Sequence, residues 1–236
     1  MRILAVGAHP DDIEILCSGT LIKHAQRGDT VFMAYVTNGN RGHAIIKPHD
    51  LAEIRKKEAE KATKVVGAEM IWLDIPDEFL YHTHETRLMF IDMIRQAQPD
   101  LIITHSPTDY HPDHVRVSDL IFAASFLSSV PSIKTRYPNH PKVVPIMYMD
   151  TLAGLNFQPT EYVDISDVID KKLEALNQHQ SQVKWLKHHD NIDILEFVKS
   201  IARFRGIQSG VEYAEGFTRQ MSWPRVQARE LLDAKL

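Results

Sequence analysis

The sequence predicts an α/β fold with a Rossmann-like, mostly parallel sheet that carries helices on both faces. Short apolar segments typical of buried strands alternate with longer segments in which apolar residues recur at helical spacing. Stretches rich in histidine and aspartate directly follow two of the predicted strands. Because ligands bind at the carboxyl ends of parallel strands, we expect an active site at that edge of the sheet.

The first part of the chain predicts two strands and two helices in alternation. A buried strand is expected over 2–6, and a helix is expected over 18–28, where Gly28 is a typical stop. The β-branched and aromatic run 29–40 predicts the second strand and ends at an Asn-Gly turn signal. Apolar residues at helical spacing then predict a helix over 51–68.

The alternation continues in the middle of the chain. Short apolar runs predict strands over 70–75, 100–106 and 144–151. Helices are expected over 87–98, which stops before a proline, and over 115–130, which is mostly apolar. Strands that alternate with helices in this way favour parallel pairing.

The remaining stretches complete the predicted organisation. Helices are expected over 167–182 and 193–206, and the KHHD stretch 187–190 is interpreted as a solvated loop. The irregular segment 132–143 is expected to be a loop that lies over the site.

The composition indicates one globular domain over residues 1–236. The 236 residues are 44% hydrophobic and carry a formal net charge of −4. No basic cluster is evident and no apolar run approaches the ~20 residues of a membrane span, so neither a nucleic-acid nor a membrane partner is expected. The single Cys17 excludes an internal disulfide and a multi-cysteine zinc site, which favours a reducing, cytoplasmic location.

Two short motifs place potential metal ligands after predicted strands. GAHPDDIE has His9 and Asp12 three positions apart, and DYHPDH has His111 and His114 at the same spacing. Imidazole and carboxylate ligands with one open position describe a catalytic zinc site and also suit other divalent ions. The first strand is not followed by the G-x-G-x-x-G pattern of dinucleotide-binding folds.

Each motif also has an ordinary structural interpretation. Two histidines in a loop are commonly surface residues, and the Asp11-Asp12 pair after a proline is typical of a turn and helix cap. The position of both motifs at strand ends favours a site. The two motifs supply four candidate ligands, and one aspartate of the Asp11-Asp12 pair is not needed among them. A hydrolytic metal site needs such a carboxylate to take a proton from the activated water.

Taken together, AHPDDIEILCSGT and HPDH resemble the LmbE/PIG-L family of zinc-dependent N-acetylglucosaminyl deacetylases. The helix IRKKEAEKATKVVGA and the stretches HQSQ and RFRGIQSGVEYAEGF resemble the same family, so that the resemblance covers nearly the whole chain. It implies a hydrolase that removes the N-acetyl group from a GlcNAc-containing small molecule. It also implies a Zn²⁺ cofactor, with another divalent metal as the alternative, and a homo-oligomer such as a trimer or hexamer.

The resemblance assigns roles to the residues of both motifs. It makes His9, Asp12 and His114 the metal ligands. Asp11 becomes the general base for a metal-activated water. His111 becomes the group that stabilises the oxyanion and protonates the leaving amine.

Four further residues are candidates with an open alternative. Asp113 either orients His111 or is a plain surface residue. Arg55 resembles a substrate-binding arginine, and its alternative is a solvated helix residue paired with a nearby glutamate. Asn40 stands where many family members carry a glutamate in a Thr-x-Gly-Glu pattern, so it is expected to bind a sugar hydroxyl without charge. Tyr110 either lines the pocket or packs beside the loop.

The preferred function is therefore N-deacetylation of a small amino-sugar substrate. One alternative is a hydrolase of another small amide, such as a sugar-thiol conjugate. Another is a non-catalytic sugar-binding protein, although a structural metal site is closed and has no use for the spare carboxylate of Asp11.

Overall fold

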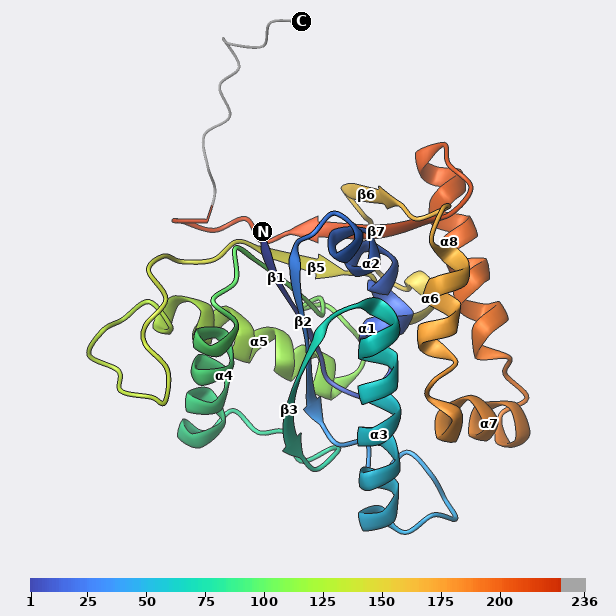
Figure 1. Cartoon of the computed structure of the whole chain (residues 1–236), viewed down its shortest axis with the longest axis horizontal. Coiled ribbons are helices and arrows are strands. Elements are labelled where there is room, and N and C mark those ends of the chain that lie inside the picture. Colours follow the sequence, from blue (N-terminus) through green and yellow to red (C-terminus); the bar gives the residue numbers. More distant parts are fainter. Residues whose placement is uncertain (226–236) are drawn as a thin grey trace, which may run out of the picture.

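The computed structural model describes residues 1–225, which form an α/β fold around a seven-stranded sheet (Figure 1). The strand order is β3-β2-β1-β4-β5-β7-β6. The strands are β1 (Arg2–Gly7), β2 (Thr30–Thr37), β3 (Glu69–Ile75), β4 (Leu101–Thr104), β5 (Ile146–Met149), β6 (Glu161–Asp164) and β7 (Ala214–Arg219). The helices are α1 (Asp12–Leu16), α2 (Ser18–Gln26), α3 (Pro48–Val66), α4 (His84–Ala97), α5 (Pro112–Leu127), α6 (Ile169–Leu176), α7 (Gln180–His189) and α8 (Ile194–Ser209), with the 3₁₀ helix η1 (Leu152–Gly154).

The first five strands pair in parallel. β1 lies between β2 and β4, β3 extends the sheet beyond β2, and β5 extends it beyond β4. β7 runs antiparallel to both β5 and β6. The predicted mostly parallel sheet is therefore confirmed. Because the chain leaves β1 towards β3 and later returns to β4 on the opposite side of β1, the carboxyl ends of β1 and β4 flank a switch point where ligands bind in such folds.

Two apolar cores cover the two faces of the sheet. Side chains of β1 alternate between them, since Leu4 and Val6 belong to one core and Ile3 and Ala5 to the other. The first core packs against α4 and α5, and the second packs against α1, α2, α3 and α6. Figure 1 shows these two groups of helices on opposite sides of the strands. Packing on both faces of the sheet fixes the positions of the strand ends and of the site beside them.

Several element boundaries differ from the prediction. The helix expected over 167–182 is two helices, because the chain turns at the buried His179 between α6 and α7. The KHHD stretch is not a loop, since residues 187–189 form the last turn of α7. The sequence-based prediction also missed the five-residue α1 and the two strands β6 and β7, which are short and lie at one edge of the sheet.

The segment 132–143 is irregular as predicted, but it does not lie over the switch point. The Arg95 guanidinium of α4 donates to the Ile133 carbonyl at 2.9 Å. At its other end Lys142 Nζ lies 3.1 Å from Asp100, just before the amino end of β4. The loop therefore packs at the edge of the sheet opposite the carboxyl strand ends. Among residues 1–225, no helix combines the length and the apolar character of a membrane span.

Candidate metal centre

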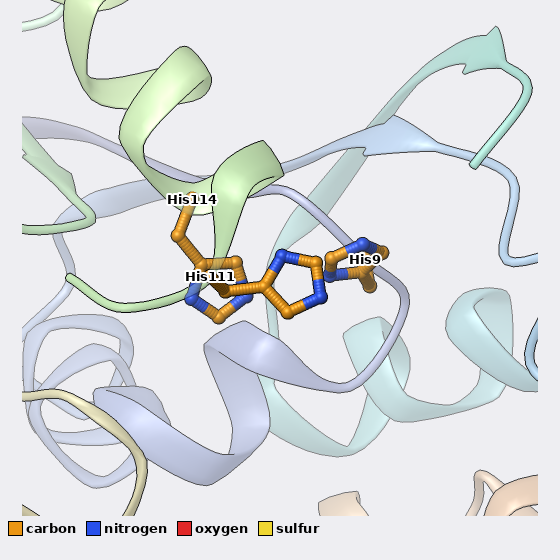
Figure 2. A group of neighbouring side chains, drawn as sticks. All are labelled: His9, His111 and His114. Carbon is orange, nitrogen blue, oxygen red and sulfur yellow. The ribbon is translucent and has the colours of Figure 1, made fainter. Parts of the chain in front are cut away.

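Two segments that are distant in the sequence bring their polar side chains together at the switch point. His9, Asp11 and Asp12 follow β1, and His111 and His114 lie at the start of α5, which follows β4. Figure 2 shows the imidazoles of His9, His111 and His114 as one group, and nitrogen atoms of the three rings lie within 4.8 Å of one another. The carboxyl ends of β1 and β4 thus hold the two motifs as the sequence predicts.

Local backbone structure fixes both motifs. The His9 N–H donates to Asp12 Oδ2 at 2.7 Å, which closes the turn between β1 and α1. Asp11, between them, has φ of 122°, a backbone conformation that non-glycine residues rarely adopt. Such strain persists only where the surroundings enforce it, and it is concentrated at functional sites. His111 is the N-cap of α5, and His114 lies one turn later on the same side of the helix.

The donor atoms are spaced as a divalent ion requires. His9 Nδ1 lies 3.3 Å from Asp12 Oδ2, and His114 Nε2 lies 3.3 Å from Asp12 Oδ1. Two zinc–ligand bonds of about 2.0–2.1 Å at a tetrahedral angle separate their donor atoms by about this distance. These two spacings suit a zinc ion, or a similar divalent ion, held by Asp12 together with His9 or with His114.

A second layer of carboxylates orients the two imidazoles. Asp109 Oδ2 lies 3.0 Å from His114 Nδ1, and Asp113 Oδ2 lies 3.4 Å from His9 Nε2. In each ring the nitrogen that faces away from Asp12 has a carboxylate partner. This arrangement is the usual one for metal-binding histidines, because it fixes the ring and makes the ligand nitrogen more basic. Sequence reasoning missed Asp109, although its place in DYHPDH beside two histidines was a usable signal.

The electrostatics of the centre point the same way. Burial alone would lower the pKa of His9 and of His114, but Asp12 and the second-layer carboxylates raise these pKa values to about 10 and about 9. Burial likewise opposes ionisation of Asp12, yet the surrounding histidines hold its pKa well below the usual range. The carboxylates therefore favour positive charge at the centre, as a metal-binding site requires.

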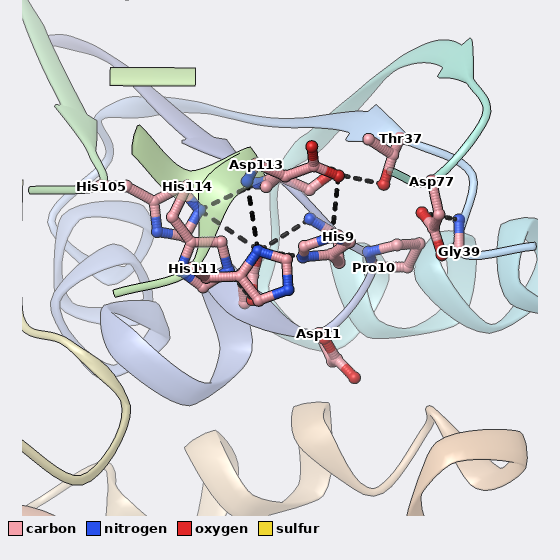
Figure 3. A network of polar contacts seen from close by, with 12 residues as sticks. His9, Pro10, Asp11, Thr37, Gly39, Asp77, His105, His111, Asp113 and His114 are labelled. Carbon is pink, nitrogen blue, oxygen red and sulfur yellow. Dashed lines mark hydrogen bonds and ion pairs between the residues drawn. The ribbon is translucent and has the colours of Figure 1, made fainter. Parts of the chain in front are cut away.

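His105 is a further member of the centre that the sequence-based prediction did not name. Its Nε2 accepts the Ala8 N–H at 2.9 Å and lies 3.2 Å from Asp12 Oδ2. The ring stacks on His114 with centroids 3.9 Å apart (Figure 3). Burial lowers the pKa of His105 to about 4, so the ring is neutral and supports Asp12 and His114 by packing. Its position directly after β4 was the available signal.

Asp11 and Asp12 diverge, as expected for neighbouring carboxylates with different tasks. Asp12 faces the imidazoles, whereas Figure 3 shows Asp11 directed away from them. Asp11 Oδ2 accepts a hydrogen bond from the buried Arg55 guanidinium at 3.0 Å. Burial raises the pKa of Asp11 to about 6, and the positive charge of Arg55 opposes that rise. Asp11 is thus a buried carboxylate whose orientation is fixed by Arg55.

Arg55 is not the solvated helix residue that was one of its two interpretations. The same guanidinium donates to the carbonyls of Pro10 and Gly39. Glu58, one turn further along α3, instead accepts hydrogen bonds from the N–H and the hydroxyl of Ser181. Ser181 belongs to HQSQ, so this contact explains why that stretch lies beside the centre.

The contact between Asp113 and His111 is not made by the Asp113 carboxylate, although that carboxylate was a candidate for orienting His111. The Asp113 N–H donates to His111 Nδ1 at 3.2 Å, while the Asp113 carboxylate lies at His9 and accepts the Glu78 N–H. The carboxylate near His111 Nε2 is that of Glu78, at 3.8 Å. Glu78 has φ of 63°, a left-handed conformation that is uncommon outside glycine. The structure therefore places Glu78, not the Asp113 carboxylate, beside the free nitrogen of His111.

The remaining two candidates lie at the rim. Asn40 Oδ1 accepts the Asp77 N–H at 3.2 Å and so ties the loop after β2 to the loop after β3. Tyr110 is 54% exposed next to His111. Neither contact tests whether these side chains bind a substrate, so their predicted roles stay proposals.

The sequence-based prediction also missed a buried polar cluster formed by Glu14, Tyr35 and His179. His179 Nε2 lies 3.1 Å from Glu14 Oε1, which accepts the Tyr35 hydroxyl at 2.5 Å. All three side chains are buried. The cluster joins α1, β2 and the start of α7, and thereby supports the turn that carries Asp11 and Asp12.

Comparisons with known proteins show which proteins this chain resembles. The family described as "PIG-L: GlcNAc-PI de-N-acetylase" matches residues 4–125. The chain is 29% identical over 226 residues to the diacetylchitobiose deacetylase of Thermococcus kodakarensis, which covers 91% of this chain and 81% of that protein. It is 26% identical to the 4-oxalmesaconate hydratase of Pseudomonas putida, with 94% and 90% covered. The solved structure of N,N'-diacetylchitobiose deacetylase from Pyrococcus horikoshii superposes with a TM-score of 0.80 at 28% identity and covers 92% of this chain and 83% of that one.

Proposed function

The chain belongs to the PIG-L family, and we propose from this premise that it is a metal-dependent hydrolase that removes the N-acetyl group from a GlcNAc-containing small molecule. The observation that supports the proposal best is a metal-fitting donor set beside a separate buried carboxylate. A closed structural site needs no such carboxylate, whereas hydrolysis needs a group that accepts a proton from water. Asp11 meets that need.

His9, Asp12 and His114 would hold the metal, with zinc as the preferred ion. When bound, the ion supplies a Lewis acid and lowers the pKa of a water molecule in the site. His105, Asp109 and Asp113 keep these ligands in place through the contacts described above.

Asp11 and Arg55 handle the proton. As water adds to the acetamide carbon, Asp11 accepts one of its protons. Arg55 holds the carboxylate through the 3.0 Å hydrogen bond, so one orientation of Asp11 is maintained. The C–N bond then breaks, the same proton passes from Asp11 to the leaving amine, and acetate is the second product.

His111 donates a hydrogen bond to the carbonyl oxygen as negative charge develops there. Its Nδ1 accepts the Asp113 N–H, so the proton of the neutral ring lies on Nε2, and the His111 side chain is partly exposed to solvent. Protonation of Nδ1 would break this cap of α5. The family resemblance implies two roles for His111, namely stabilising the oxyanion and protonating the leaving amine. We therefore assign only the first role to His111 and assign delivery of the proton to Asp11.

Hydration of an organic anion is a second candidate, because the relative named 4-oxalmesaconate hydratase matches this chain almost from end to end. A metal site and a carboxylate base also suit the addition of water to a double bond. However, Glu78 places a carboxylate 3.8 Å from His111 Nε2, where it repels an anionic substrate. Deacetylation of an uncharged sugar is the better match to this charge.

The test is product formation from a panel that contains N-acetylglucosamine, N,N'-diacetylchitobiose, a GlcNAc–thiol conjugate and 4-oxalmesaconate. We expect acetate and free amine in equal amounts from at least one GlcNAc compound. Hydration of 4-oxalmesaconate without any acetate release would replace the proposal with the second candidate. Binding of the sugars without turnover would favour the non-catalytic alternative.

Metal removal gives the first prediction. The purified protein is expected to carry about one divalent ion per chain, since one set of three ligands takes one ion. Dialysis against a chelator should abolish acetate release, and added zinc should restore it. Elemental analysis and the deacetylation assay on the same samples provide the check. Full activity in metal-free protein would contradict the proposed mechanism.

Asp109 gives the second prediction. Asp109→Asn keeps the shape of the side chain but removes the charge that faces His114 Nδ1. Loss of such a partner typically weakens metal affinity by 10–100-fold, and we expect about tenfold for this conservative change. Competition with a fluorescent chelator measures the affinity. Asp119→Asn, at an exposed position of the same helix α5, is the matched control and should leave it unchanged.

A further inference from the structure

We propose that His179 is a positioning residue for Asp11, because it keeps Glu14 from drawing Asp11 into an ordinary helix cap. The proposal rests on the role of Asp11 as the base in the proposed function. It also assigns a task to the histidine of the HQSQ stretch. His179 acts through Glu14 and not by contact with the reacting atoms.

The local sequence at the start of α1 favours a capping box. Asp11 is the N-cap of α1, and Glu14 follows it three positions later. In a capping box, the side chains at these two positions each accept the backbone N–H of the other residue. The same residue types at the same spacing begin α8, where Asp193 Oδ1 accepts the Glu196 N–H at 3.3 Å. A box at α1 would occupy the Asp11 carboxylate in the same way.

The box is not formed at α1. The Asp11 side chain makes no cap hydrogen bond, and its φ is 122°, whereas φ of Asp193 is −84°. Glu14 Oε1 accepts the Tyr35 hydroxyl at 2.5 Å and lies 3.1 Å from His179 Nε2. Within residues 1–225, Glu14 Oε2 has no hydrogen-bond partner, so the Glu14 carboxylate does not bind the Asp11 N–H. Tertiary contacts have therefore replaced the local cap.

The contact between His179 and Glu14 is a buried pair of charges. Both side chains are fully buried. Burial alone would lower the pKa of His179, but the carboxylates of Glu14 and Asp11 raise it, which favours the charged ring. Such a pair stabilises a fold little, because the cost of desolvation offsets the attraction. Its presence beside a strained residue of the site points to a function other than stability.

Asp11 therefore has two competing arrangements. In the structure its Oδ2 accepts the hydrogen bond of Arg55 at 3.0 Å, and the backbone of Asp11 stays strained. In the capped arrangement the same carboxylate would accept the Glu14 N–H and would no longer be held for proton transfer. By keeping the Glu14 side chain occupied, His179 favours the first arrangement.

The experiment is a double-mutant cycle of His179→Leu and Glu14→Met, with kcat for N,N'-diacetylchitobiose measured in the zinc-loaded enzyme. His179→Leu should lower kcat about tenfold, roughly the factor by which one N-cap interaction shifts an equilibrium. KM and metal content should stay as in wild type. Methionine at position 14 has no carboxylate to complete the box, so in that background His179→Leu should change kcat by less than about threefold. A merely structural role of His179 would give the same loss in both backgrounds.

Two further variants accompany the cycle. Tyr35→Phe removes the other hold on Glu14 with little change of shape, so it should lower kcat in the same direction, and only where Glu14 is present. It replaces His179→Leu in the cycle if that protein does not fold. His140→Leu is the matched control, because His140 is buried in the loop 132–143 at the opposite edge of the sheet, and it should leave kcat unchanged.

The remaining outcomes separate the positioning role from the proposed function. Equal losses of kcat in both backgrounds, or loss of metal from His179→Leu, would overturn the role of His179 and leave the deacetylase intact. If N,N'-diacetylchitobiose is not deacetylated, crystal structures of the wild type and of His179→Leu decide. A Glu14 carboxylate on the Asp11 N–H in the variant supports the positioning role, and an unmoved Glu14 rejects it. Absence of acetate from every GlcNAc compound tested counts against the proposed function alone.

Discussion

Asp11→Asn is expected to lower kcat by about 10²–10⁴-fold while the protein keeps its metal, because loss of a positioned general base has an effect of this size. Asparagine keeps the shape and can still accept the hydrogen bond of Arg55, but it cannot take a proton from water. In the proposed mechanism, Asp12 would still hold the ion together with His9 and His114. Elemental analysis and kcat, measured on the same preparation, give the result.

The matched variant for this experiment is Asp12→Asn. It changes the neighbouring carboxylate in the same way, but it should lose metal as well as activity. A metal-free Asp11→Asn protein together with a metal-replete Asp12→Asn protein would mean that the two aspartates exchange roles. The strained backbone at Asp11, with φ of 122°, makes a thermal unfolding scan of both variants a useful check on folding.

Replacement of His114 and of His111 should separate a ligand from an oxyanion donor. His114→Ala removes one of three protein ligands, so we expect low metal content and no measurable turnover. His111→Ala should keep the metal and lose about 10²–10³-fold in kcat, the usual cost of removing one oxyanion donor. Metal content and kcat of both variants, prepared identically, are the two readouts.

His111→Asn adds a control that the structure makes available. His111 caps α5 by accepting the Asp113 N–H, and asparagine is among the best N-cap residues. This variant should therefore unfold at nearly the wild-type temperature and still be slow. Equal metal loss in the His111 and His114 variants would indicate a four-ligand site and would remove the catalytic role proposed for His111.

The sequence predicted those features of the fold that depend on local patterns of residues. The apolar run before His9 predicted a buried strand, and the positions of GAHPDDIE and DYHPDH after predicted strands indicated that the two loops meet at the carboxyl ends of the sheet. That meeting is what the parallel pairing of β1 with β4 produces. The alternation of elements was enough to predict the sheet class, because local periodicity reports strands and helices directly.

The parts that the sequence did not predict depend on tertiary contacts. The positions of Asp109 and His105 at the end of a predicted strand were a usable signal, but only the fold shows that Asp109 contacts His114 and that the His105 ring stacks on it. Arg55 had two interpretations because helical spacing does not say which polar residue is buried. No glycine or proline marks the turn at His179, so the break between α6 and α7 carried no local signal.

His9 and His114 reach the centre from segments that are far apart in the sequence and come together only through the pairing of β1 with β4. An unfolded chain holds no such set of ligands, so the proposed ion would bind the folded chain alone. By mass action, a free ion concentration 100 times the dissociation constant would add about 2.7 kcal/mol to the free energy of unfolding. The proposed catalytic ion would thereby also act as a clamp across the middle of the sheet, and the free energy of unfolding would rise with the metal concentration of the surroundings.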